Sequence, residues 1–156
     1  MIHCGRRVWP EQLLAFHGCL FMESIFLFCK EAAAGPDGRL NIQGVFNELY
    51  ASDFPARQDH LVLVGVIEWE RHTQGRIPFK IDLTDPDGKS VFSIDGHTDV
   101  ESRPVNSAPA KTQLVLPMEK VMFPVPGQYR VRLTVNDAET LGPSMHLMRS
   151  DDKQDR

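Results

Sequence analysis

Two stretches of the chain alternate strictly between apolar and polar side chains, and this period of two constrains the fold more than any other feature. Their apolar members are Ile77, Phe79, Ile81 and Leu83 in the first stretch, and Tyr129, Val131, Leu133 and Val135 in the second. Such alternation is typical of a strand that turns one face to a core and the other to solvent. No segment with the 3.6-residue period of a helix lies between the predicted strands, which argues against a parallel α/β sheet. The sequence therefore predicts an all-β fold.

Short strands are predicted along the rest of the chain, separated by turn signals. They cover residues 25–29, 40–50, 61–69, 91–94, 114–118 and 144–148, and turns fall at residues 35–38, 85–88, 123–127 and 136–137. Residues 61–64 are apolar on both faces, which is typical of a central strand. Pro78 cannot donate a backbone hydrogen bond, which favours a sheet edge at that point. Seven to eight antiparallel strands of this kind predict a two-sheet β-sandwich.

The composition limits the classes of partner. The length of 156 residues suits one domain, and an apolar fraction of 42% is enough for one core. The formal net charge is −4 and the pI is near 5.8, so no global basic field attracts nucleic acid or acidic lipid. Charges interrupt every apolar stretch well short of the ~20 residues that a membrane span needs. We therefore expect no nucleic-acid partner and no membrane partner.

The three cysteines are Cys4, Cys19 and Cys29. An odd number at irregular spacing is no disulfide framework, and none of them forms a CxxC ligand pair. This usage favours a reducing compartment, so we expect a cytoplasmic protein.

Residues 1–21 do not share the pattern of the rest of the chain, and three interpretations compete for them. An export signal would use the arginine pair ahead of a short apolar run, but a proline, a glutamate and a histidine interrupt it and no cleavage site follows. The second interpretation is a helix over residues 11–21. The third, which we favour, is that translation begins at Met22. We expect a poorly packed N-terminal extension, a β-sandwich domain over residues 22–149 and a charged tail over residues 150–156.

Several short motifs lie in a specific order and spacing along the predicted domain. They are Leu40, residues 44–47 (GVFN), 53–56 (DFPA), 83–89 (LTDPDGK), 114–117 (LVLP) and 123–129 (FPVPGQY). In these motifs, residues 22–148 resemble an uncharacterised bacterial family of small domains of unknown function. The resemblance implies an immunoglobulin-like β-sandwich, and it implies no activity, because no catalytic or ligand residues are assigned in that family. The turn before Tyr129 also looks like a corner of such sandwiches, where a tyrosine bonds to the backbone.

The most suggestive cluster for metal chemistry is Asp95, His97 and Asp99. Two carboxylates and an imidazole within five residues could share a cation, helped by His60 or His72 from other loops. Residues 96–110 are polar and interrupted by proline, so they are predicted to form a mobile loop, and such loops commonly carry these residue types without binding anything. Structural zinc sites need four convergent ligands. We therefore assign no metal and keep Asp95, His97 and Asp99 only as candidates.

Other catalytic and binding motifs fail on spacing. Residues 85–88 (DPDG) start like a calcium loop but lack the glycine and glutamate that an EF-hand needs further on, so a hairpin turn is favoured. Ser90 or Ser93 with His97 and Asp99 lacks a nucleophile elbow. Cys29 lies in an apolar strand, where a thiol is usually inert core. No phosphate loop or dinucleotide fingerprint is present. We predict no catalytic residues, no cofactor and no enzymatic activity.

Two groups of surface candidates remain. Lys80, Arg130 and Arg132 are expected on outward faces, where they would form a basic patch if their strands are neighbours, with Glu68 and Glu70 neutralising it across a hairpin. Trp69, Phe54 and Tyr50 could form a carbohydrate platform, although aromatic side chains in small sandwiches are usually core.

The leading functional hypothesis is a non-enzymatic protein-interaction module. Such a module would bind a protein partner through an edge strand or a loop cluster, or would associate with its own copy. The alternative is a small-ligand or carbohydrate-binding domain, and the third hypothesis is a metal-dependent hydrolase that uses the loop around His97.

Overall fold

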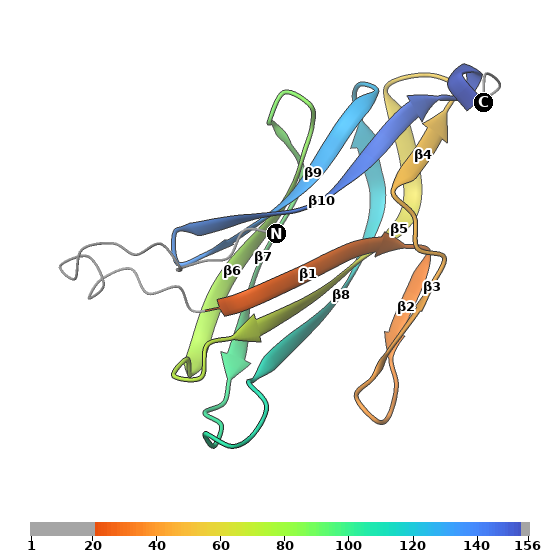
Figure 1. Ribbon diagram of the computed structural model, residues 1–156. Helices are drawn as coiled ribbons and strands as arrows, with labels where there is room; N and C mark the ends of the chain where they lie inside the picture. The colour runs from red at the N-terminus through yellow and green to blue at the C-terminus, as the bar shows by residue number, and fades with distance from the viewer. Residues whose placement is uncertain (1–20, 154–156) are drawn as a thin grey trace.

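The computed structural model describes residues 21–153, and the regular structure in that range is all strand apart from one short 3-10 turn (Figure 1). The strands are β1 (Phe21–Cys29), β2 (Glu31–Ala34), β3 (Leu40–Gln43), β4 (Glu48–Ala51), β5 (Ala56–Trp69), β6 (Gly75–Thr84), β7 (Ser90–Val100), β8 (Lys111–Phe123), β9 (Gly127–Val135) and β10 (Ala138–Arg149), and the 3-10 turn η2 (Ser150–Lys153) follows. The prediction of an all-β fold is confirmed.

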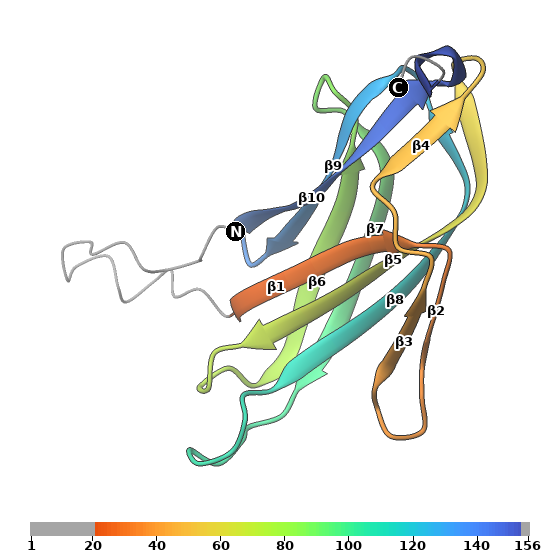
Figure 2. The same cartoon turned by 45° about the vertical axis from the view of Figure 1, so that its right-hand side comes forward.

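The strands form two main sheets and one separate hairpin. Strands β1, β5 and β8 make a three-stranded antiparallel sheet, and the order β4-β10-β9-β6-β7 makes a five-stranded sheet in which β4 and β10 run parallel. The sheets lie against each other as two layers (Figure 2). Apolar side chains from both fill the space between them, among them Ile67 and Trp69 from the first sheet and Leu83 and Tyr129 from the second. The immunoglobulin-like order of the strands stays a prediction.

The two alternating stretches are the strands β6 and β9, which lie side by side in the five-stranded sheet. All eight of their apolar side chains are buried in the core between the sheets, as predicted. Their register places Leu83 beside Val131 and Ile81 beside Leu133. Pairing between β6 and β9 begins at Phe79, so at Pro78 the strand β6 has only β7 as a partner. Pro78 therefore marks a local edge, as its missing N–H predicts.

The turn at residues 85–88 is a hairpin turn between β6 and β7, as predicted. The amide of Gly88 donates to the carbonyl oxygen of Asp85 at 3.0 Å, which closes the turn. The carboxylate oxygen Oδ1 of Asp85 accepts hydrogen bonds from the amides of Asp87, at 2.9 Å, and Lys89, at 2.8 Å. The aspartate thus serves the backbone of its own turn.

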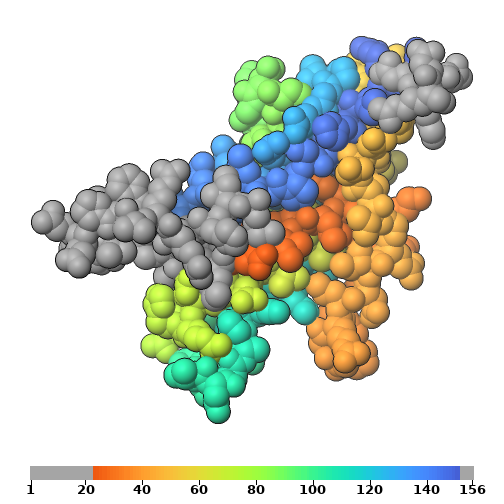
Figure 3. All heavy atoms as spheres, viewed as in Figure 1, coloured from red at the N-terminus to blue at the C-terminus, as the bar shows by residue number. Residues whose placement is uncertain are grey.

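The hairpin β2–β3 was not predicted as such, and it covers the outer face of the three-stranded sheet. Its apolar face carries Ala32, Leu40 and Ile42, which pack against Val62 and Val64 of β5. This second cluster explains why residues 61–64 are apolar on both faces: alternate side chains point into the main core and under the hairpin. Strand β5 is also central in its sheet, as predicted. In the space-filling view the hairpin, coloured orange, projects from the body of the domain (Figure 3).

Two predicted boundaries need correction. Residues 96–110 were predicted as a loop, but β7 continues to Val100. Gly96 pairs with Phe79, and a Cβ atom at Gly96 would lie 2.8 Å from the Phe79 ring, so this glycine makes room for an aromatic neighbour inside a strand. Residues 40–50 form two strands, because the chain turns at Gly44 with a φ of 69°. The prediction for residues 1–21 falls outside the described part, except for Phe21, where β1 begins.

Candidate functional site

The candidate metal residues Asp95, His97 and Asp99 lie on strand β7 and not on a loop. They occupy alternate positions on one exposed face of the strand, where neighbouring members are ~6.5 Å apart along the chain. The imidazole of His97 contacts Arg76 on β6, with 2.6 Å between Nη2 of the arginine and Nε2 of the histidine. His60 lies on β5, in the other sheet. Among the residues that the structure describes, no three His, Cys, Asp or Glu side chains are grouped to hold an ion.

The expected basic patch does form on neighbouring strands, but a buried carboxylate lies within it. Lys80 and Asp82 of β6 lie beside β9, where Arg132 pairs with Asp82 and Arg130 with Thr84. Asp82 is only 3% exposed, and its Oδ2 atom lies 3.6 Å from Nη2 of Arg132. Burial alone would raise the pKa of Asp82, but hydrogen bonds from Ser93 and Ser90 and the charges of Lys80 and Arg132 outweigh it and hold the pKa below its ordinary value.

The prediction that Glu68 and Glu70 neutralise this patch is wrong. Glu68 belongs to β5 in the other sheet, where it forms an ion pair with Lys111 at 3.6 Å. Glu70 follows directly after β5. The error arose because the sequence does not reveal which strands share a sheet. The carboxylate that does lie within the patch, Asp82, alternates with the apolar residues of β6, and nothing in the local pattern indicates its burial.

Two of the three aromatic candidates, Trp69 and Phe54, and the thiol of Cys29 pack in or against the apolar clusters. Trp69 is fully buried, and its Nε1–H donates to Oγ1 of Thr112 at 2.8 Å, so it cannot belong to an exposed carbohydrate platform. Phe54 packs partly against the main core. Cys29 is fully buried beside Val62, and burial raises the pKa of its thiol, which agrees with an inert core position.

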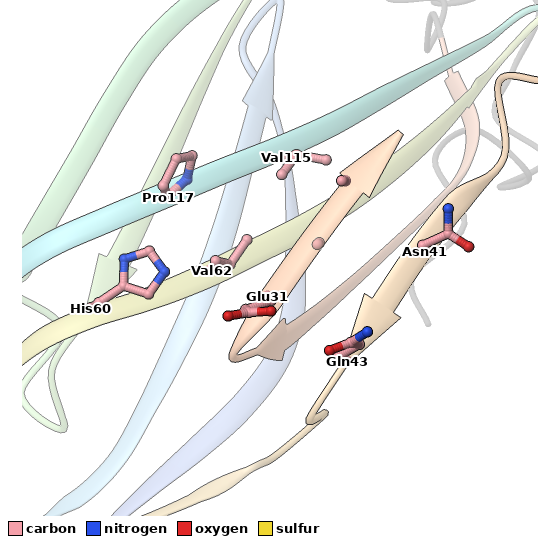
Figure 4. A pocket seen from close by; sticks show the side chains of 9 residues that line it. Glu31, Asn41, Gln43, His60, Val62, Val115 and Pro117 are labelled. Atoms are coloured by element: carbon pink, nitrogen blue, oxygen red, sulfur yellow. The ribbon is translucent and has the colours of Figure 1, made fainter. Parts of the chain in front are cut away.

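A groove of about 420 Å³ lies between the hairpin β2–β3 and the outer face of β5 and β8 (Figure 4). Its apolar floor is made by Val62 of β5 and by Val115 and Pro117 of β8. The hairpin contributes Glu31, Ala32, Ala33, Asn41 and Gln43, and β5 adds His60. An apolar floor with a few polar groups around it is the usual make-up of a binding site in proteins.

The backbone of β2 along this groove is an unpaired strand edge. Among the described strands, β2 pairs with β3 alone. The amide of Gly35 donates to the carbonyl of Arg39 at 2.8 Å, in the same ladder. Bonded and non-bonded pairs alternate along an antiparallel ladder, so the backbone groups of Ala32 and Ala34 point away from β3, towards the free edge. In Figure 4, β3 lies on one side of β2, and Val115 and Pro117 lie on the other.

This groove could not be predicted from the sequence pattern, because residues 31–34 (EAAA) show no apolar–polar contrast that would indicate a strand. A usable signal was present elsewhere. Residues 61–64 are apolar on both faces and therefore require a cover on each side of their sheet, and the nearest predicted turn before them is at residues 35–38.

Comparisons with known proteins place this fold in a sequence family but attach no activity to it. The sequence profile described as a family of unknown function (DUF6941) matches residues 24–147. No curated protein matches the chain. Among solved structures, the chain is similar to the Pseudomonas fluorescens alkylpurine DNA glycosylase AlkC bound to DNA containing an abasic site analog, with a TM-score of 0.35 and 12% identity. That similarity covers 65% of this chain and 27% of the glycosylase chain. No helix of the described residues has the length and apolar character needed to cross a membrane.

Proposed function

Since the chain belongs to the DUF6941 family, for which no function is established, we propose from its geometry that it is a non-enzymatic protein-interaction module built on an immunoglobulin-like sandwich. A fold by itself does not define a function, so the proposal depends on a site. That site is the groove beside the free edge of β2, and it is the observation that carries the proposal.

The order of the strands supports an immunoglobulin-like arrangement. In that fold, strands A, B and E share one sheet, and C, F and G share the other, with C′ added in the variable type. If β1, β5 and β8 are taken as A, B and E, then β6, β7, β9 and β10 take the places of C, C′, F and G. The resulting orders, A-B-E and G-F-C-C′, match the orders β1-β5-β8 and β10-β9-β6-β7, with β4 as an additional strand beside the one in the place of G.

Tyr129 gives a second, independent support for this arrangement. It lies near the start of β9, the strand in the place of F, and its hydroxyl donates to the carbonyl of Val125 at 2.7 Å. The amide of Val125 returns a hydrogen bond to the same hydroxyl at 3.3 Å. The ring packs edge-on against Phe123, with 5.0 Å between ring centroids. A tyrosine that ties the E–F corner to the backbone is a hallmark of immunoglobulin-like sandwiches.

The groove favours a protein partner because of what it offers chemically. Free backbone groups on β2 can pair with another chain, and an apolar floor lies beside them. Strand edges that are left open in folded proteins are usually blunted by charges, proline or a bulge. Residues 32–34 of β2 are three alanines, so none of these devices protects the middle of this edge.

The test uses the full-length protein as bait for native lysate, with captured proteins identified by mass spectrometry. We expect wild type and Val105→Arg, a control at an 87% exposed valine outside the groove, to capture the same partner. Val115→Arg, which puts a charge on the groove floor, should lose that partner. Ala33→Arg, at an exposed groove residue, should lose it while leaving the thermal melt unchanged. The partner is then purified, and its Kd should weaken about tenfold or more in both groove variants. Equal Kd values for all four proteins would overturn the proposal.

A further inference from the structure

We propose that the groove receives an extended, apolar peptide segment bearing lysine or arginine, which adds to β2 as a new strand. This inference rests on the proposed function and names the class of partner. Three observations carry it: the free backbone edge, the apolar floor, and the charge of the lining.

The free edge sets the conformation of the partner. The backbone groups of Ala32 and Ala34 point to the free edge of β2, and they can be satisfied by the backbone of an extended chain, as in other cases of strand addition. The alanine side chains leave the edge accessible to a second backbone. Because β2 is four residues long, the paired part of the peptide is about four residues, or ~13 Å.

The floor sets the alternation of the partner's side chains. Val62, Val115 and Pro117 form an apolar surface on one side of the edge. A paired strand would turn alternate side chains towards this floor and the others towards solvent and the groove rim. Small or medium apolar residues therefore suit every second position of the peptide.

The charge of the lining selects the remaining side chains. The lining residues include one carboxylate, Glu31, and no lysine or arginine. A second carboxylate, Glu119, lies directly opposite His60 in the ladder of β5 and β8. The nearest lysine in sequence, Lys30, directly precedes Glu31 and has its aliphatic stem against Gly44, just after β3, and it is not among the lining residues. With a net charge of −4 on the whole chain, this rim favours cationic side chains and disfavours acidic ones.

The test is a titration of the isotope-labelled full-length protein with three capped peptides of about eight residues, followed by NMR. In the first, valine alternates with lysine; in the second, glutamate replaces lysine; the third is the lysine peptide with alternate backbone amides methylated. We expect the lysine peptide to shift the amide signals of β2 and Val62, and to slow hydrogen exchange at Ala32 and Ala34. The glutamate peptide and the methylated peptide should each bind with a Kd at least about tenfold higher than that of the lysine peptide. Glu31→Gln should lower the affinity of the lysine peptide several-fold, while the control Glu139→Gln, on the other sheet, should leave that affinity unchanged.

Each other result overturns this inference. If the lysine and glutamate peptides bind with equal affinity, the groove does not select for positive charge. If the methylated peptide binds as tightly as the unmethylated lysine peptide, the peptide does not add to β2 as a strand. A dimer in sedimentation that Ala33→Arg dissociates would assign the groove to a second copy. NMR contacts from residues 1–20 to Ala32 in the free protein would assign the groove to the chain's own N-terminal segment.

If the peptides leave the NMR signals of β2 unchanged while capture of a protein partner still depends on Ala33, this inference fails and the proposed function stands. Capture that is indifferent to Ala33 and Val115 removes the proposed function itself.

Discussion

Val62 and Leu63 are adjacent on strand β5, yet they are buried in two different apolar clusters. Leu63 is 2% exposed and packs in the core between the two sheets, whereas Val62 is 3% exposed and packs under the hairpin β2–β3. Because neighbouring side chains of a strand point to opposite faces, this one strand holds the main core and the hairpin together. The floor of the groove is therefore fixed to the most buried part of the domain.

Truncation of Val62 should destabilise the protein even though it lies on the outer face of its sheet. We expect Leu63→Ala to cost about 2–5 kcal/mol of unfolding free energy, and Val62→Ala about 1.5–3 kcal/mol for two buried methyl groups. The control, Val105→Ala, removes the same atoms from an 87% exposed side chain and should cost less than about 0.5 kcal/mol. Urea melts measure all three. A Val62→Ala protein as stable as the control would show that the hairpin does not pack as described.

Leu83 and Lys80 test the register of β6. Leu83 is 3% exposed in the core and Lys80 is exposed on the opposite face, as the alternation predicts. Leu83→Ala should cost about 2–5 kcal/mol, and Lys80→Ala less than about 0.5 kcal/mol. Tyr129→Ala should resemble Leu83→Ala, because Tyr129 is fully buried. A slip of one residue would exchange the two faces and reverse the ranking of Leu83→Ala and Lys80→Ala in denaturant melts.

The same two strands show what sequence can predict here and where it stops. In β6 and β9, apolar side chains alternate with polar ones and all of the alternating apolar members point to the core, so the pattern alone predicts their positions. Strand β2 has no such contrast between apolar and polar residues, because its last three residues are all alanine and the same residue type therefore lies on both faces. The sequence predicts a loop from Gly96 onward because the strand partner of Gly96, Phe79, lies on another strand and leaves no local signal. Pairing between distant segments is not encoded in a local period, and the groove depends on such pairing.

Residues 1–21 should be dispensable for folding. They lack the alternation of the later strands, and the family match begins at residue 24. A chain that starts at Met22 should melt within a few degrees of the full-length protein. It loses one backbone pairing, between Phe21 and Trp69 at the end of β1. Insolubility or a larger fall in the melting temperature would show that the segment belongs to the fold.

The exposed residues of β7 should hold no tightly bound metal. His97 is engaged by Arg76, and Asp95 and Asp99 lie at alternate positions of an extended strand. Elemental analysis for zinc and calcium, after purification without added metal, should give far less than one ion per chain. A stoichiometric ion that disappears in His97→Ala would contradict this and would favour the hydrolase hypothesis.

Asp82 should make the stability of the protein sensitive to acid. Its pKa is held below the ordinary value of about 3.9, so the folded state binds the proton less readily than the unfolded state does. The stabilisation is therefore fully present above about pH 4 and is lost as the pH falls through the lowered pKa. Protonation would also weaken the ion pair with Nη2 of Arg132, a guanidinium whose Nε atom is buried with no hydrogen-bond partner.

Asp82→Asn should lower the unfolding free energy at pH 7 by about 1–3 kcal/mol, because the charged partner of Arg132 is lost. The fall in stability between about pH 4 and pH 2 should then be shallower than in wild type, because one of the groups responsible no longer titrates. Asp95→Asn is the control. Asp95 is an exposed aspartate on β7, opposite Lys80 of β6, and its replacement should change the unfolding free energy by less than about 0.5 kcal/mol. Urea melts across this pH range give both quantities. An unchanged acid slope in Asp82→Asn, with a changed slope in Asp95→Asn, would mean that the exposed face of β7, and not the buried carboxylate of β6, governs the response to acid.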